Sequence, residues 1–290
     1  MLNHQGADSD MAVERAANSV GIIGCGWLGK ALARELIQNN FPVMVTTTRE
    51  EKAAELTQAG LEARVLTLPQ QVLPLSEHDI FSSRQLVICI TPQLKKGRTD
   101  YPEKVAQLVA AAEKNAVEKV ILISTSSVYN GLAGEVYEDA VLDMAANKVA
   151  ILAEAEQSVL DFNGLSAVVR MTGLIGPGRH PGRFLAGKKD LANPDAAVNL
   201  IHQSDALGLI MCLLKQTGVQ GVFNGVANTR MSRQHFYQQA AAILDLPCPA
   251  FNEQDRGSLG KQINGDKGRR ELSYDYRYDD LVQWMKENEH

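Results

Sequence analysis

Three glycines spaced as Gly-x-Gly-x-x-Gly follow a short apolar run near the beginning of the chain. They are Gly24, Gly26 and Gly29. With this spacing the first glycine can turn the backbone out of a strand, the second can admit a pyrophosphate, and the third can let a helix pack closely. That helix would start at Leu28, directly after Trp27, and the positive end of its dipole favours an anion. These five residues are therefore candidate dinucleotide-binding residues.

The residues that follow the next candidate strand, Val43–Thr47, indicate which dinucleotide fits. An acidic residue at this point would hold the free ribose hydroxyls of NAD. The chain has Thr48 and Arg49 instead, and a guanidinium can bind a 2′-phosphate through two parallel hydrogen bonds. We therefore expect NADP rather than NAD. NAD stays an alternative, in which Arg49 is solvated and Glu50 or Glu51 binds the ribose.

These residues need a fold that presents strand ends and helix starts together. From Ser19 onward, β-branched runs alternate with amphipathic stretches, which is typical of βαβ units around a parallel sheet. Several strands read as unbroken apolar runs, which indicates a sheet covered on both faces. The sequence therefore predicts an α/β doubly wound parallel sheet, a Rossmann fold. The expected strands are Val20–Ile23, Val43–Thr47, Ala63–Leu66, Gln85–Ile90, Lys119–Ser124 and Ser166–Met171. The expected helices are Leu28–Asn39, Glu50–Ala59, Tyr101–Asn115 and Ala146–Phe162.

The composition changes after Met171, where Gly, Pro, Lys and Arg become frequent. We expect a flexible tail over residues 1–18, an NAD(P)-binding domain over 19–171, and a small mixed substrate lobe over 172–290 that is partly interleaved with the sheet. Within the lobe the sequence predicts a helix capped by Ser204 or Asp205. The expected elements of the lobe are a strand at Ala197–Ile201 and helices at Ser204–Gln216 and Ser232–Leu244.

The overall charge and hydropathy exclude several classes of partner. A net charge of −5 and a pI near 5.7 provide no broad basic field, so we expect no nucleic-acid partner. The apolar runs are shorter than the roughly 20 residues of a bilayer crossing, so we expect no membrane partner. The first eighteen residues lack a secretory signal pattern, and the four cysteines show no zinc-site spacing. We expect a cytoplasmic protein with reduced thiols and no metal.

A hydroxyl-rich segment ends the fifth expected strand, where Lys119–Asn130 reads Lys-Val-Ile-Leu-Ile-Ser-Thr-Ser-Ser-Val-Tyr-Asn. With the glycine loop, it resembles the extended short-chain dehydrogenases/reductases, the NAD(P)-dependent epimerase/dehydratase family, whose fifth strand ends in a Ser/Thr cluster followed by Val-Tyr-Gly. Arg170–Arg179 resembles the family's Arg-x-x-x-(Ile/Val)-(Tyr/Phe)-Gly-Pro-Gly motif. Asn199–Ala206 resembles its (Asn/Phe)-x-(Ile/Val)-His-(Val/Ile)-x-Asp-(Ala/Leu) segment. The four matches occur in the family's order.

The resemblance implies roles for four further positions. Thr125 falls where the family keeps a Ser or Thr that hydrogen-bonds the reacting carbonyl or hydroxyl, although hydroxyls at strand ends also satisfy backbone groups. Thr91 falls where the family's chain passes the adenine ribose and phosphates. Thr172 and Gly173 fall where it passes the nicotinamide. The resemblance also implies a small-molecule substrate, such as a nucleotide-linked or phosphorylated sugar.

The family's Tyr-x-x-x-Lys pair is absent from the helix expected at Ala146–Phe162. In the family the Lys lowers the pKa of the phenol, so that the tyrosine exchanges a proton near neutral pH. If Glu156 matches the family's glutamate, Lys148 and Leu152 occupy the two positions. If Glu154 matches it, two alanines do. The chain is in this respect similar to the atypical short-chain dehydrogenases.

Three side chains are candidates for the proton transfer or for packing around it. Lys148 could hold the nicotinamide ribose or act as a positive electrophile, or it is a solvated helix lysine. Tyr137 precedes the helix and is a candidate proton donor. Tyr129 belongs to the Val-Tyr motif and is expected to pack rather than react. The candidate catalytic residues are thus Thr125, Lys148 and Tyr137.

Two functions are compatible with these residues. One is an NAD(P)-dependent, epimerase/dehydratase-like oxidoreductase, and the other is a catalytically silent NADP(H)-binding sensor or regulatory protein. A proton donor beside the nicotinamide would favour the enzyme, and an apolar surrounding would favour the sensor. The resemblance further implies a homodimer formed through the helices at Tyr101–Asn115 and Ala146–Phe162. Basic side chains that would suit a substrate phosphate, or form a solvated loop, are Arg179, His180, Arg183, Lys188 and Lys189.

Overall fold

The central sheet of the computed structural model has seven strands in the order β10-β7-β5-β4-β1-β2-β3. The structure describes residues 18–68, 74–115, 117–257 and 259–287, so residues 1–17 of the predicted N-terminal tail lie outside the described residues. The pairs β1–β2, β2–β3, β1–β4 and β4–β5 are parallel. Because the chain leaves β1 toward one edge and returns at β4 toward the other, the sheet is doubly wound as predicted.

Strands and helices alternate up to β5, with two 3₁₀ turns between β3 and β4, and the later elements occur in mixed order. The sheet strands are β1 (Val20–Ile23), β2 (Val43–Thr47), β3 (Glu62–Val65), β4 (Gln85–Ile88), β5 (Lys119–Thr125), β7 (Leu165–Met171) and β10 (Gly221–Gly225). The helices of this part are α2 (Trp27–Gln38), α3 (Glu50–Gln58), α4 (Tyr101–Glu113) and α5 (Asn147–Leu160). The later strands are β6 (Gly134–Val136), β8 (Gly173–Ile175), β9 (Leu200–His202) and β11 (Lys261–Ile263). The later helices are α6 (Gly182–Leu185), α7 (Gln203–Lys215), α8 (Arg233–Ile243), α9 (Asp266–Leu272) and α10 (Leu281–Glu287).

The chain divides into two compact units by its internal contacts. The first comprises residues 1–124, 151–168 and 217–221, and the second comprises 125–150, 169–216 and 222–290. Strands β7 and β10 therefore begin in the first unit and end in the second.

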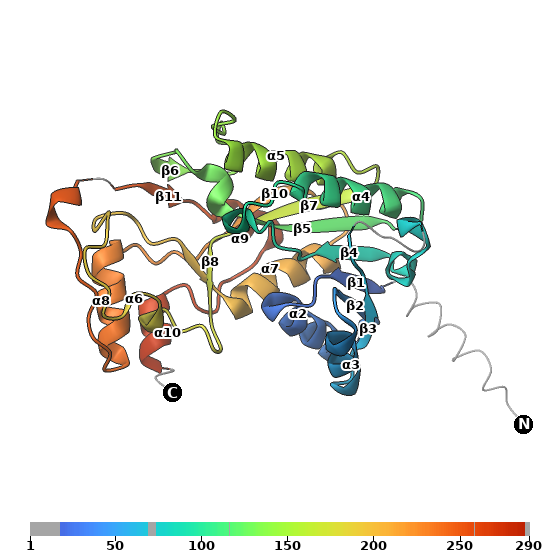
Figure 1. Ribbon diagram of the computed structural model, residues 1–290, viewed down its shortest axis with the longest axis horizontal. Helices are drawn as coiled ribbons and strands as arrows, with labels where there is room; N and C mark the ends of the chain where they lie inside the picture. The colour runs from blue at the N-terminus through green and yellow to red at the C-terminus, as the bar shows by residue number, and fades with distance from the viewer. Residues whose placement is uncertain (1–17, 69–73, 116, 258, 288–290) are drawn as a thin grey trace, which may run out of the picture. The chain divides into compact units, whose positions relative to one another are not determined.

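The first unit buries its sheet between helices (Figure 1). All four residues of β1 and all four of β4 are buried, as expected for apolar strands that are covered on both faces. Leu32 and Leu36 of α2 are fully buried, and so are Val105 and Leu108 of α4. These residues recur every three or four positions, so each helix places one apolar stripe against the strands.

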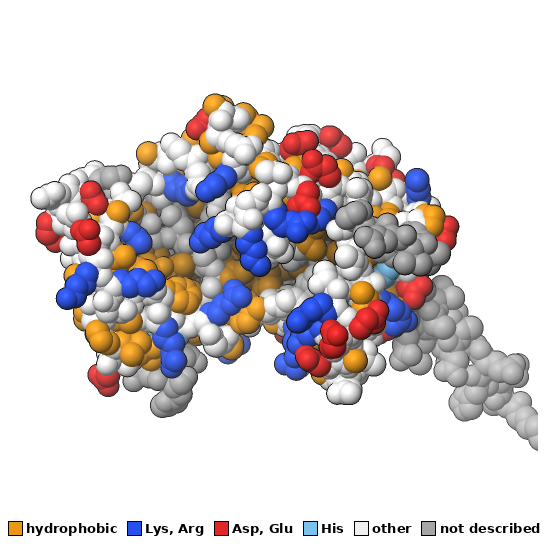
Figure 2. Space-filling view, in the orientation of Figure 1, with side chains coloured by type: hydrophobic (Ala, Val, Ile, Leu, Met, Phe, Trp, Pro, Cys, Tyr) orange, Lys and Arg blue, Asp and Glu red, His pale blue; other side chains and the backbone are white. Residues whose placement is uncertain are grey.

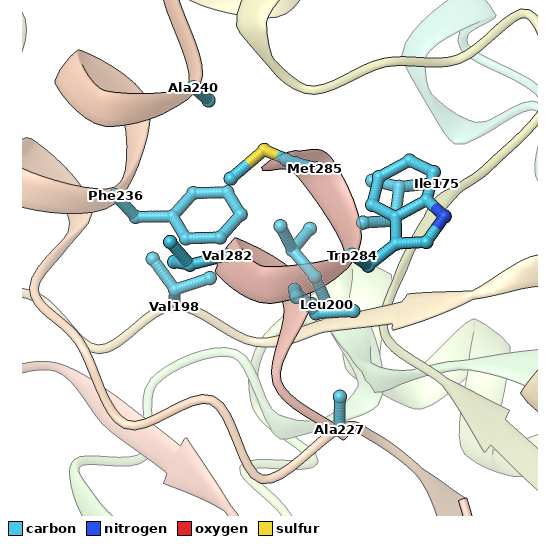
Figure 3. Packing of buried hydrophobic residues seen from close by; sticks show 10 residues of the cluster. Ile175, Val198, Leu200, Ala227, Phe236, Ala240, Val282, Trp284 and Met285 are labelled. Carbon is cyan, nitrogen blue, oxygen red and sulfur yellow. The ribbon is translucent and has the colours of Figure 1, made fainter. Parts of the chain in front are cut away.

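The second unit has its own apolar core, shown in Figure 3. Phe236 of α8 and Met285 of α10 point toward each other, and Trp284 lies beside Ile175. Two small parallel pairs, β8 with β9 and β6 with β11, complete this unit. On the face shown in Figure 2, Lys and Arg side chains are interspersed with Asp and Glu side chains.

The later part of the chain differs from the sequence-based expectations in three places. Strand β10 was not expected, because its five residues begin and end with glycine and contain no apolar run. The strand expected at Ala197–Ile201 is the shorter β9. Helix α7 is capped by neither Ser204 nor Asp205: Nδ1 of His202 accepts the Ser204 N–H at 3.1 Å, while Asp205 is buried and accepts a hydrogen bond from the Tyr274 hydroxyl.

No helix in the described part of the chain is long and apolar enough to cross a membrane. Among the same residues, no group of three or more His, Cys, Asp or Glu side chains could hold a metal ion.

Candidate functional site

The turn between β1 and α2 requires two of its three glycines for steric reasons. Gly24 has φ 103°, a conformation that disfavours side chains. A methyl group on Gly29 would lie 2.4 Å from the carbonyl oxygen of Gly24. The first glycine therefore makes the turn and the third lets α2 approach the strand end, as the spacing predicts.

The second glycine, Gly26, has a different surrounding. A methyl group at this position would meet no described atom within 4 Å. Gly26 is the N-cap of α2, and no side chain caps this helix start. The space beside Gly26 is therefore open at the positive end of α2, which is the arrangement that receives a phosphate.

Thr46 holds the glycine loop in shape, and sequence analysis did not assign it a role. Its buried Oγ1 accepts the Gly24 N–H at 3.2 Å, and its carbonyl oxygen accepts the Cys25 N–H at 2.8 Å. The loop is thus tied to β2 by both the side chain and the backbone of one residue. The sequence signal that could have identified this role is a threonine near the end of the strand that follows the glycines.

A cavity of about 550 Å³ lies beside this loop, within the first unit. Five predicted cofactor residues line it: Gly24, Gly26, Thr48, Arg49 and Thr91. Three other predicted cofactor residues do not line the cavity. They are Trp27, Leu28 and Gly29 of α2, of which Leu28 and Gly29 are buried. Glu50 and Glu51, the alternative ribose ligands, do not line it either.

The charged side chains among the described lining residues are all basic. These lining residues include four cations and no carboxylate, the cations being Arg49, Lys52, Arg98 and Lys104. Three of these cations are ion-paired with carboxylates outside the lining: Glu55 lies 2.6 Å from Lys52 Nζ, and Asp100 lies 2.5 Å from Arg98 Nη2 and 2.9 Å from Lys104 Nζ. Hydrogen bonds from Arg98 and Lys104, together with their charges, hold the pKa of Asp100 well below its usual range. A cavity of this kind suits a ligand that carries several negative charges.

Two thiols also line the cavity. Cys25 and Cys89 are both free. Burial raises the pKa of Cys25, and burial together with Cys25 raises the pKa of Cys89 to about 12. Both groups are therefore uncharged thiols at neutral pH, which are poor nucleophiles.

Thr125 ends β5 and starts a short 3₁₀ turn over Ser126–Tyr129. Its Oγ1 accepts the Ser127 N–H at 3.2 Å and donates to the Ser127 hydroxyl at 3.2 Å. The hydroxyl thus caps the backbone, which is the structural role weighed for it in the sequence. Thr125 is half-buried.

A buried hydrogen bond distinguishes Glu156 from Glu154, the two residues of α5 that could match the family's glutamate. Ser124 Oγ lies 2.5 Å from Glu156 Oε1, and both residues are buried in the first unit. Glu154 is exposed. Lys148 is exposed in the first turn of α5, whereas Leu152 is buried. Of the two glutamates, Glu156 therefore joins α5 to the end of β5.

Tyr129 and Tyr137 have different environments. The Tyr129 hydroxyl donates to Asn224 Oδ1 and accepts from Arg170 Nη1, both at 2.8 Å, and its ring is fully buried. Tyr129 is therefore a packing residue, as expected. Tyr137 is 46% exposed, and a hydrogen bond to Glu135 raises the pKa of its phenol.

Thr172 and Gly173 belong to the second unit. The Thr172 hydroxyl is buried and donates to the carbonyl oxygen of Gly225 at 2.8 Å. A methyl group on Gly173 would lie 2.5 Å from a side-chain carbon of Leu200. Thr172 is thus held to the end of β10, and glycine at position 173 leaves room for Leu200 of β9.

Comparisons with known proteins agree with this architecture. The model of the NAD(P)H-binding family matches residues 24–205. Protein YeeZ of Escherichia coli K12 is 32% identical over 267 residues, which cover 90% of this chain and 96% of YeeZ.

Two solved structures share the fold. The human epimerase family protein SDR39U1 with NADPH has a TM-score of 0.70 at 17% identity and covers 93% of this chain and 99% of its own. MoeE5 in complex with UDP-glucose and NAD has a TM-score of 0.72 at 18% identity, with coverage of 93% and 99%. At this identity the likeness concerns the fold, which is that of epimerase/dehydratase-like short-chain dehydrogenases. By its sequence, the chain belongs to the NAD(P)H-binding family.

Proposed function

We propose that the protein is an NADP-dependent, epimerase/dehydratase-like oxidoreductase that acts on a nucleotide-linked or phosphorylated sugar. The observation that carries the proposal is the cavity at the glycine loop, whose described lining contains four cations and no carboxylate. A dinucleotide with an additional 2′-phosphate matches this charge better than one with free ribose hydroxyls.

Arg49 and Lys52 are the residues that we assign to the 2′-phosphate. Both follow β2, the strand after which short-chain dehydrogenases bind the adenosine ribose, and both line the cavity. Arg49 can form two parallel hydrogen bonds, and Lys52 adds a point charge. The amides of Trp27 and Leu28, at the uncapped start of α2, are assigned to the pyrophosphate.

Thr125 and Lys148 are assigned to the substrate. When bound, the nicotinamide would supply or accept a hydride at the substrate carbon. The Thr125 hydroxyl would donate a hydrogen bond to the substrate oxygen. The Lys148 ammonium stands in place of the family's phenol and would stabilise negative charge on that oxygen. Tyr137 is the remaining candidate donor, but the neighbouring Glu135 makes its phenol a weaker acid.

The substrate class rests on the fold neighbours. MoeE5, which shares the fold, binds UDP-glucose together with NAD. We extend this class of substrate, a sugar linked to a nucleotide or phosphate, to the present chain as a proposal.

We also propose a homodimer through α4 and α5. Ala106 and Ala110 lie one turn apart on the exposed side of α4, and small residues let two helices approach closely. Light scattering during size-exclusion chromatography distinguishes the dimer from the monomer of 31.6 kDa.

Turnover of nucleotide-linked sugars in the presence of NADP tests the proposed enzyme. Change in reduced-nicotinamide absorbance detects net oxidation, and NMR of the sugar detects epimerisation or dehydration without net redox change. We expect turnover that is lost in Lys148→Met. Tight NADP binding without turnover of any such sugar would contradict the enzyme and leave the silent sensor.

A further inference from the structure

A second cavity, of about 540 Å³, lies within the second unit and is lined by polar and aromatic side chains. It contains two histidines, two other aromatic side chains, an arginine and a serine, and none of its described lining residues is acidic. Its lining residues are Gly176, Pro177, Gly178, His180, Arg183, His202, Ser204, Tyr278 and Trp284. Of the basic loop noted in the sequence, only His180 and Arg183 line it.

Both histidines present the same ring nitrogen as a donor. Nδ1 of His180 accepts the Gly182 N–H at 3.1 Å, and Nδ1 of His202 accepts the Ser204 N–H at 3.1 Å. A neutral imidazole that accepts at Nδ1 carries its proton at Nε2. Burial lowers the pKa of both rings, aided by Arg183 at His180 and by Arg277 at His202, and the pKa of His202 falls to about 4. Both rings are therefore neutral N–H donors at neutral pH.

Aromatic contacts hold these donors in fixed positions. The ring of Trp284 stacks on His180 with the centroids 5.8 Å apart, and it lies 4.6 Å from His202. Tyr278 meets His202 edge to face at 4.4 Å. Trp284 is itself packed beside Ile175 in the core (Figure 3). Donors that are fixed before binding lose little freedom when a ligand arrives.

Nε2 of His180 is buried and has no hydrogen-bond partner among the described residues. A buried N–H without an acceptor is unfavourable, so a site that retains one is expected to provide an acceptor in its working state. A side chain at position 176 would crowd the second donor, because a methyl group on Gly176 would lie 3.2 Å from Nε2 of His202. Glycine at this position keeps the loop clear of the second donor.

We propose that this cavity binds a small phosphate monoester. Arg183, which is exposed at the cavity, would grip two phosphate oxygens with its guanidinium fork, and the Nε2–H groups of His180 and His202 would donate to the remaining oxygens. Ser204 contributes a hydroxyl. The lining has donors for three oxygens and no described carboxylate that would repel them, which favours a phosphate over a carboxylate or a cation. The assignment uses none of the residues of the cofactor cavity and holds whether or not the proposed function does.

Titration with glucose 1-phosphate tests this site without cofactor. Calorimetry measures the affinity, and NMR of ¹⁵N-histidine-labelled protein follows Nε2 of His180. We expect a dissociation constant below about 1 mM and a shift of the Nε2–H resonance. Arg183→Gln should weaken binding by about tenfold or more, because a charge-assisted fork is lost.

Arg179→Gln is the matched control. This substitution removes the same charge from the same loop, but Arg179 does not line the cavity. Ser204→Ala should weaken binding less than Arg183→Gln and keep the protein folded. Thermal unfolding of each variant reports folding independently of cofactor binding. Absence of binding at about 10 mM, equal weakening by Arg179→Gln, or an equal shift caused by acetate would overturn the proposal.

Discussion

The buried hydroxyl of Ser124 lies 2.5 Å from the carboxylate of Glu156 and joins the end of β5 to α5. Glu156 is buried at this contact, whereas Glu154, the other candidate counterpart of the family's glutamate, is exposed. If Glu156 is the counterpart of the family's glutamate, Lys148 would stand at the position of the family's catalytic tyrosine and the buried Leu152 at the position of its lysine. The proposed chemistry therefore depends on an ammonium group rather than on a phenol.

Ser124→Ala should destabilise the protein by about 1–3 kcal/mol, because it removes a hydrogen bond from a buried carboxylate. Urea denaturation followed by circular dichroism measures the change. Ser158→Ala, which removes an exposed hydrogen bond to a backbone carbonyl of the same helix, should change stability by less than about 0.5 kcal/mol. Equal effects of the two substitutions would contradict the anchoring role.

Alanine at two glycines of the loop should separate folding from binding. Gly26→Ala meets no described atom within 4 Å, so the protein should keep its stability but bind NADPH at least about tenfold more weakly, because the methyl group occupies the space of the phosphates. Gly29→Ala would place a methyl group 2.4 Å from a carbonyl oxygen and should lower stability by about 1–3 kcal/mol.

Thermal unfolding and calorimetric titration of both variants check this pair. Unchanged NADPH affinity in Gly26→Ala would show that the open space beside α2 is not the phosphate site.

Lys148→Met should reduce turnover by about 10²–10⁴-fold while leaving the affinity for NADPH unchanged, because the side chain is assigned to the substrate oxygen. Lys148→Arg, which keeps the charge, should retain part of the activity. Lys114→Met changes an exposed lysine at the end of α4 and should have no effect. Steady-state kinetics with each variant measure the difference, and full activity of Lys148→Met would remove Lys148 from the mechanism.

His202 should make stability depend on pH. Its pKa is about 4 in the folded protein and near 6.5 when unfolded, so the unfolded chain binds more protons between these values. Stability should therefore be complete above pH 6.5 and should fall by about 2–3 kcal/mol as the pH approaches 4.

Urea denaturation across this pH range measures the slope. His202→Asn can still cap α7 and should flatten it, whereas His235→Gln, at an exposed position, should leave it unchanged. A slope that persists in His202→Asn would assign the pH dependence to other groups.

Local patterns predicted most of the sheet. β1 and β2 have the expected bounds, because an apolar run next to a glycine turn or a hydroxyl cluster is a strong local signal. β10 was missed because Gly221 and Gly225 bracket only three residues, and its membership in the sheet depends on pairing with a strand distant in sequence.

The candidate site was predictable only in part, for a related reason. Arg49 and Thr91 are visible from their place after a strand, and both line the cavity. Arg98 and Lys104 reach the same cavity from a loop and a helix start, where a basic side chain has no distinguishing pattern. The second cavity brings together His180, His202 and Trp284, which lie in three separate segments, and no spacing rule connects them.

The affinity of the protein for NADPH and NADH tests the central claim most directly. Calorimetric titration of the unmodified protein, of Arg49→Ala and of the matched control Arg34→Ala, whose arginine is exposed on α2 and does not line the cavity, separates the 2′-phosphate contact from general charge. We predict that NADPH binds at least about tenfold more tightly than NADH, and that Arg49→Ala but not Arg34→Ala removes this preference. Equal affinity for the two nucleotides, or no binding of either at millimolar concentration, would contradict the assignment of the cavity to NADP.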